Sequence, residues 1–300
     1  MRAIVSVAVT LACFQSVAAR GGEDAEHYAT RARYWLETGD YDKAIEDYNH
    51  ALLLDPNNAA AYLGRSSAWG GKREYDKAIE DCNAALRINP TLATAYHSRG
   101  IAWQQKHEYN KAIEDYNEAL RLDPKNADAC CSRASAWGEK REYGKVLDDC
   151  NAALRIRPSF ALAYYIRGNA WREKGDYARA TEDYKEAIRL APSDAYTYNG
   201  LAWVQATCPD ERYRDGKEAV ANVNRIIDLG PPEQWYYHGT FAAAYAESGD
   251  FTKAIESQTK AIELAAKDVS ARDSDKEELG VCLELYKQGK PYREEPKPKP

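Results

Sequence analysis

Covalent and metal chemistry need cysteine, histidine and carboxylate side chains at particular spacings, and this 300-residue chain contains seven cysteines and five histidines. No two cysteines are spaced Cys-x-x-Cys, and no two histidines are spaced His-x-x-x-His, which are patterns typical of redox and metal sites. The sequence also lacks a glycine-rich phosphate loop and a Gly-x-Ser-x-Gly nucleophile motif. The residue types therefore predict no metal, no cofactor and no catalysis, so we do not expect an enzyme.

Charged residues recur at a regular spacing of 34 residues. A row of arginines at this spacing would suit an anionic ligand, but a row of aspartates keeps the same spacing and offers each arginine a partner. The sequence therefore favours partly buried Arg–Asp pairs over a stripe that binds anions. The two rows are Arg31, Arg65, Arg99, Arg133 and Arg167, and Asp47, Asp81, Asp115, Asp149 and Asp183.

The balance of charge excludes one class of partner. The chain has 47 acidic and 41 basic residues, which gives a formal net charge of −6. A surface that binds nucleic acid needs an excess of lysine and arginine to neutralise phosphates. We therefore expect no nucleic-acid partner.

The first nineteen residues differ in character from the rest of the chain. Arg2 precedes an apolar stretch from Ala3 to Ala12, and small residues precede an expected cleavage point after Ala19. This order is typical of a secretory signal, and the stretch is too short to span a bilayer. We expect residues 1–19 to be a cleaved signal peptide and the protein to be periplasmic or extracellular. The alternative is a lipid anchor through Cys13.

The elements that position these residues follow from an internal repeat of 34 residues. Within one repeat, Tyr96, Gly100 and Trp103 mark one face of a first helix. A break near Tyr109 precedes a second helix, which Pro124 ends because proline cannot continue a helix. The same register is kept by three rows: Pro56, Pro90, Pro124, Pro158 and Pro192; Trp35, Trp69, Trp103, Trp137 and Trp171; and Tyr41, Tyr75, Tyr109, Tyr143 and Tyr177.

With a small residue, a tyrosine, two alanines and a proline at set positions, this unit resembles the tetratricopeptide repeat over roughly residues 23–266. The resemblance implies an all-α fold, a right-handed superhelical solenoid of antiparallel helix pairs with a concave inner surface. About seven repeats are expected, near residues 25–58, 59–92, 93–126, 127–160, 161–194, 195–233 with an insertion, and 235–266.

The chain beyond the repeats divides into two expected parts. Within residues 267–290, the stretch Asp273 to Lys287 has an apolar face and predicts an amphipathic helix that caps the open end of the solenoid. Residues 291–300 end in alternating proline and lysine, and we expect them to be disordered.

Two segments carry a second resemblance, to exported bacterial tetratricopeptide proteins. One is Leu201-Ala202-Trp203 followed by Ala206-Thr207-Cys208-Pro209-Asp210, and the other is Gly289-Lys290-Pro291-Tyr292-Arg293. This resemblance implies that the protein comes from a bacterium and acts outside its cytoplasm.

In the tetratricopeptide family, the first helix of each pair lines the concave groove. The resemblance therefore implies a binding surface on these helices, where the residue types vary while the packing positions do not. A mixed polar and aromatic groove suits an extended peptide or a partner helix. The predicted peptide-binding residues are His97, Gln104, Tyr165, Asn169 and Arg172.

Two functions from different classes remain for such a solenoid. The favoured hypothesis is a non-catalytic adaptor that binds a protein or peptide in its concave groove. The alternative is a structural or self-associating envelope scaffold that uses its edges or convex face. A large apolar patch on the convex face would favour the scaffold.

Overall fold

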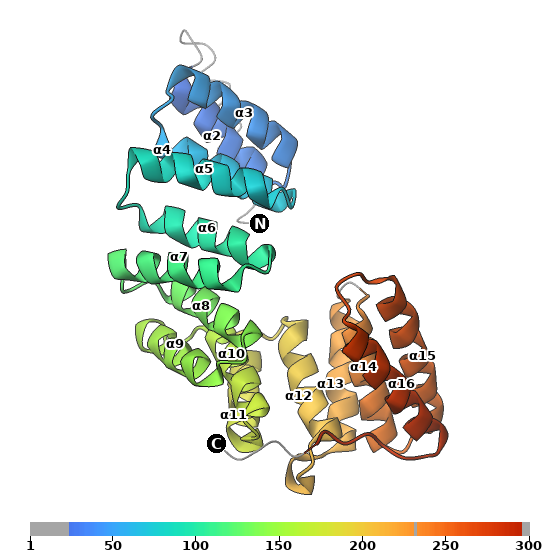
Figure 1. The fold of residues 1–300 in the computed structure, drawn as a ribbon. Helices are drawn as coiled ribbons and strands as arrows, with labels where there is room; N and C mark the ends of the chain where they lie inside the picture. The colour runs from blue at the N-terminus through green and yellow to red at the C-terminus, as the bar shows by residue number, and fades with distance from the viewer. Residues whose placement is uncertain (1–23, 231–232, 296–300) are drawn as a thin grey trace. The chain divides into compact units, whose positions relative to one another are not determined.

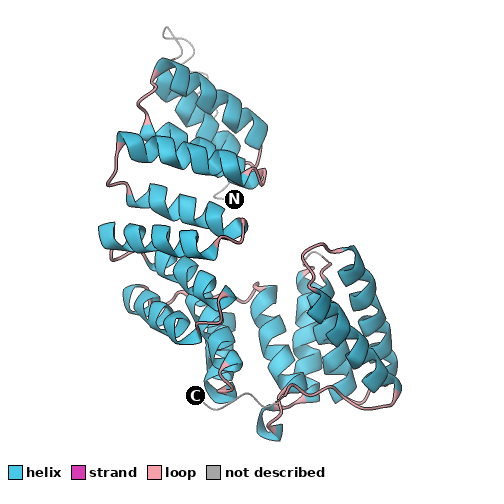
Figure 2. Ribbon diagram, viewed as in Figure 1, coloured by secondary structure: helices cyan, strands magenta, loops and turns pink. Residues whose placement is uncertain are grey.

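The computed structural model describes residues 24–230 and 233–295. Every regular element in these ranges is a helix, and they contain no strand, as Figure 2 shows. The all-α fold class is therefore confirmed. The expected signal peptide, Cys13 and residues 296–300 lie outside the described ranges. None of the described helices is long and apolar enough to cross a membrane.

The chain divides into two compact units, residues 1–140 and 141–300, which are described separately below. In the first unit each helix packs against the next along the chain (Figure 1). Its helices are α2 (Ala25–Glu37), α3 (Tyr41–Leu54), α4 (Ala59–Gly71), α5 (Tyr75–Ile88), α6 (Ala93–Gln105), α7 (Tyr109–Leu122) and α8 (Ala127–Glu139).

The second unit continues the helix pairs and ends in a further helix that packs against α15. Its elements are α9 (Tyr143–Ile156), α10 (Ala161–Glu173), α11 (Tyr177–Leu190), α12 (Ala195–Thr207), the short 3-10 helix η1 (Glu211–Tyr213), α13 (Gly216–Leu229), α14 (Trp235–Glu247), α15 (Phe251–Lys267) and α16 (Asp273–Lys287). The last helix buries Leu279, Cys282 and Tyr286, so it has the apolar face expected of the capping helix. About seven helix pairs and a cap fit these bounds.

Close approach of the two helices in a pair depends on the small residue in the first helix. A Cβ atom on Gly100 of α6 would lie 2.6 Å from Cε1 of Tyr116 in α7. Tyr116 is fully buried, so its ring has no room to move away. Glycine at this position therefore allows the ring to fill the space between α6 and α7. Gly168 of α10 meets Tyr184 of α11 in the same way.

The repeated arginines and aspartates join the helices of each pair. Arg99 donates from Nε and Nη2 to the two carboxylate oxygens of Asp115, at 2.8 and 2.6 Å, and from Nη1 to Asn83 Oδ1 of the preceding repeat at 2.5 Å. The guanidinium also lies 5.4 Å from the ring of Tyr96. The prediction of ion pairs is confirmed for four pairs: Arg31–Asp47, Arg65–Asp81, Arg99–Asp115 and Arg167–Asp183.

Candidate binding site

The five predicted binding residues lie in two different units. His97 and Gln104 belong to α6 of the first unit, whereas Tyr165, Asn169 and Arg172 belong to α10 of the second. The structure therefore brings together two residues in one unit and three in the other, and each set is described within its own unit.

In the first unit, both predicted residues are tied to one buried tyrosine. Tyr116 donates its hydroxyl to Gln104 Oε1 at 2.8 Å, and its ring lies 5.7 Å from the ring of His97. His97 Nε2 also lies 3.0 Å from Ser132 Oγ. Burial lowers the pKa of His97, so its imidazole is neutral at pH 7. These contacts support the packing of the helices and leave less of the two side chains for a ligand.

In the second unit, the predicted residues of α10 lie beside buried aromatic groups. The ring of Tyr165 is 6.4 Å from that of Tyr184, whose hydroxyl donates to Asn169 Oδ1 at 2.7 Å. Burial raises the pKa of the Tyr165 hydroxyl, which therefore stays protonated at neutral pH. Tyr165 and Asn169 can thus offer neutral hydrogen-bonding groups on an aromatic surface.

Tyrosines from the next two first helices extend this surface. Tyr196 of α12 is about half exposed, and its ring lies 6.4 Å from that of Tyr236 in α14. Helix α12 contacts both α10 and α14. Asn199 Oδ1 is buried and has no hydrogen-bond partner among the described residues. We refer to the residues Tyr165, Asn169, Arg172, Tyr196, Trp203 and Tyr236 as the α10–α12–α14 face.

Arg172 is a charged member of this face. It donates from Nη2 to Glu173 at 2.8 Å, and its Nη1 lies 3.8 Å from the carboxylate of Glu294. Its Nε atom is buried and has no hydrogen-bond partner in the part of the chain that the structure describes. Arg172 therefore offers a positive charge to a ligand, and the carboxylate of Glu294 lies near this charge in the structure.

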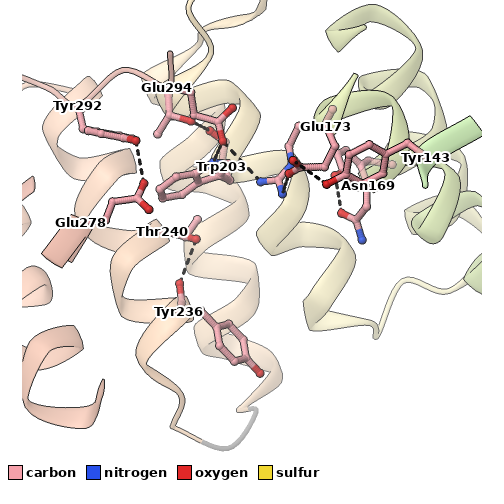
Figure 3. Close-up of polar contacts among 12 residues, drawn as sticks. Tyr143, Asn169, Glu173, Trp203, Tyr236, Thr240, Glu278, Tyr292 and Glu294 are labelled. Atoms are coloured by element: carbon pink, nitrogen blue, oxygen red, sulfur yellow. Dashed lines mark hydrogen bonds and ion pairs between the residues drawn. The ribbon is translucent and has the colours of Figure 1, made fainter. Parts of the chain in front are cut away.

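We refer to residues Pro291–Glu295 as the tail segment. Figure 3 shows two of its residues, Tyr292 and Glu294, beside Trp203. Trp203 donates its indole N–H to Glu294 Oε1 at 2.6 Å, and the ring of Tyr292 lies 6.1 Å from that of Trp203. The expected disorder of residues 291–300 stays a prediction. The side chains of Glu294 and Tyr292 contact Trp203 of α12, and the Tyr292 hydroxyl donates to Glu278 of α16 at 2.7 Å. Composition cannot show such partners, because they lie far away in the sequence.

Two clefts are also present. One of about 650 Å³ lies between α11, α12, η1 and α13, with Lys185, Gln205 and Arg212 among its polar lining residues. Another of about 400 Å³ lies in the first unit, beside Gly70 and Tyr75. No group of His, Cys, Asp or Glu in the described ranges could hold a metal ion. Burial raises the pKa values of the Cys82 and Cys208 thiols to about 11, which keeps both protonated and unreactive at neutral pH.

Comparisons of the sequence with models of known protein families match the segments that form helix pairs. Models of the tetratricopeptide repeat match residues 29–93, 93–126, 161–194 and 237–268. A comparison with curated proteins finds no significant match.

Solved structures show the same fold. A tetratricopeptide repeat protein from Parabacteroides merdae aligns with a TM-score of 0.64 at 17% identity, over 89% of this chain and all of that one. A chain of the Cut9–Hcn1 hetero-tetramer of APC/C aligns with a TM-score of 0.73 at 14% identity, over 94% of this chain and 52% of that one. MamA from Desulfovibrio magneticus aligns with a TM-score of 0.51 at 17% identity, over 58% and 98%. At these identities the likeness concerns the fold alone.

Proposed function

This chain belongs to the tetratricopeptide-repeat family, and on that premise we propose that it is a non-catalytic adaptor that binds a protein or peptide on its α10–α12–α14 face. Proteins of this fold act by binding, and fold by itself does not name the partner. The proposal therefore depends on the chemistry of the face.

The observation that carries this proposal is the gathering of half-buried tyrosines and amides on three successive first helices. Tyrosine supplies a large contact area with a polar end, which is why it is enriched in binding surfaces. Tyr196 is 53% exposed, so its ring is available to a ligand.

The test compares two variants as bait in an extract of the source organism. Tyr165→Ala with Tyr196→Ala removes two rings from the face, whereas Ile227→Ala removes a similarly exposed apolar side chain from the second helix α13. The adaptor proposal expects partners that are captured by the native chain and by the Ile227 variant, and lost with the double variant. Equal capture by all three baits, or self-association alone, would favour the scaffold instead.

We also propose that the adaptor acts outside the cytoplasm after removal of residues 1–19. The support is the order of Arg2, the apolar stretch and the small residues before Arg20. Mass spectrometry of the protein from fractionated cells should find a mature form that begins at Arg20. A form that begins at an acylated Cys13 would replace this proposal with a lipid anchor, and an intact N-terminus in the cytoplasm would contradict both.

A further inference from the structure

The tail segment makes both backbone and side-chain contacts with the second unit. Besides the Trp203 bond, the backbone N–H of Glu294 donates to the carbonyl of Thr207 at 2.9 Å. The Glu294 side chain is only 13% exposed, although it lies near the end of the chain. Its carboxylate is therefore largely removed from water and depends on Trp203 and Arg172 for compensation.

Arg293 occupies a second, oppositely charged position. It donates from Nη1 to the carbonyl of Ala206 at 3.2 Å, and its Nη2 lies 2.5 Å from the carboxylate of Glu247 in α14. Arg214 holds the other oxygen of Glu247 at 3.4 Å, and the Glu247 side chain is 14% exposed. A carboxylate buried to this extent needs cationic partners, so Glu247 forms a site for a positive charge.

Between these two charged positions lies the end of α12. The last carbonyls of a helix have no partner within the helix, and they favour cations and N–H donors. Here Val204 and Gln205 accept from the backbone of Cys208 and Asp215, whereas Ala206 and Thr207 accept only from the tail segment among the bonds of the described chain. The Thr207 carbonyl accepts the backbone N–H of Glu294 and can pair with any extended backbone, whereas the Ala206 carbonyl accepts a side-chain N–H of Arg293.

We infer that Arg172, Trp203, the last two carbonyls of α12 and Glu247 form a binding site for an extended peptide in which an arginine is followed by a glutamate, and that Arg293-Glu294 fills this site in the free chain. The inference rests on the proposed adaptor function and adds the ligand's chemistry. The order of charges is set by geometry, because Glu247 binds the arginine and Arg172 with Trp203 binds the glutamate.

The nature of the contacts makes the tail segment replaceable. They are hydrogen bonds, ion pairs and one ring contact, and the same contacts can be made by another chain of the same chemistry. Attachment to the end of α16 places the segment at an effective concentration on the order of millimolar. An external peptide of the same chemistry and greater length competes by also contacting Tyr196 and Tyr165. The free protein is thus held in a self-blocked state.

The first test observes the indole N–H of Trp203 by NMR in the full chain. Its signal is assigned by its loss in Trp203→Phe. We expect the signal to move in the Arg293→Ala, Glu294→Ala double variant, which releases the segment, and to stay in place in Glu295→Ala, which changes an exposed neighbour of the same charge. Circular dichroism checks that helicity is unchanged. An identical Trp203 signal in all three chains would overturn the occupied state.

The second test adds the chain's own residues 289–295 as a free peptide with blocked ends. We expect it to bind the released double variant, to return the Trp203 signal to its position in the intact chain, and to bind the intact chain at least about tenfold more weakly. A peptide with the arginine and glutamate exchanged should also lose at least about tenfold in affinity. No binding to the released variant, or equal affinity for both chains, would overturn the binding site.

Failure of the self-blocked site and failure of the adaptor proposal give different results in these experiments. The capture experiment changes Tyr165 and Tyr196, which take no part in the tail contacts described above. Loss of partners with that variant, together with a Trp203 signal that never moves, would leave the adaptor supported and the self-blocked site refuted. Conversely, peptide binding to the released chain with unchanged partner capture would support the site and refute the wider face.

Discussion

Arg99 is a residue whose single replacement should be costly, because it compensates a buried charge. Asp115 is only 6% exposed, and Arg99 donates two hydrogen bonds to its carboxylate. We expect Arg99→Met to lower the free energy of unfolding of the first unit by about 3 kcal/mol, since it leaves that carboxylate unpaired. Urea denaturation measures the change. The control, Arg121→Met, breaks an exposed pair with Glu118 and should cost less than about 0.5 kcal/mol. Equal losses would contradict a structural role for the arginine row.

The imidazole of His97 should make the first unit sensitive to acid. Burial lowers its pKa from the ordinary 6.5, an effect that the negative charge of Asp128 opposes. The folded state therefore takes up a proton less readily than the unfolded chain, so stability is retained above pH 6.5 and falls as the pH drops below it. We expect His97→Asn to flatten this part of the stability profile, measured by urea denaturation at several pH values. Superimposable slopes for the two proteins would refute the assignment.

At the scale of elements, the turn between the helices of a pair requires a residue with positive φ. Gly39 fills this position with φ 80°, whereas Arg73 adopts φ 61° at the matching position of the next repeat. A Cβ on Gly39 would meet no atom within 4 Å, so Gly39→Ala tests the backbone alone. We expect Gly39→Ala to destabilise the first unit by about 1 kcal/mol and Arg73→Gly to cause no loss, because glycine adopts this conformation readily. Thermal unfolding of both variants measures this, and a loss with Arg73→Gly would contradict it.

The helices could be predicted from the sequence because the residues that pack the two helices of a pair lie within one repeat. The break expected near Tyr109 is where α7 begins, and the proline at 124 follows the end of α7 at Leu122. The ion pairs were also predictable, since Arg99 and Asp115 recur with the repeat. The site was predictable only in part. Arg172 was chosen from its place in the repeat, and its role in binding stays a prediction. Its neighbour Glu294 lies in an aperiodic segment far along the chain, where no spacing signals a contact.

At the scale of the whole molecule, the repeat array makes stability a property of neighbours. Each helix contacts chiefly the helices next to it along the chain. Removal of one end of the array should therefore destabilise only the helices beside that end. Helix α16 covers α15 through Leu279, and Gln258 of α15 donates to the Leu279 carbonyl at 2.8 Å. The cap therefore satisfies both apolar and polar groups that would otherwise face water.

Removal of the cap gives the last prediction. A chain that ends at Asp268 exposes the alanines of α15 that pack on Leu279, whereas a chain that ends at Lys290 keeps α16 and loses residues 291–300, which include the tail segment. We expect hydrogen exchange to show lost protection in α14 and α15 of the shorter chain, with α2 to α7 unchanged, because local unfolding follows lost burial. The longer chain should keep protection in α14 and α15, because it retains α16 and its contacts through Leu279. If protection fell equally in all helices of the shorter chain, the stability of the array would be global and the nearest-neighbour account would be wrong.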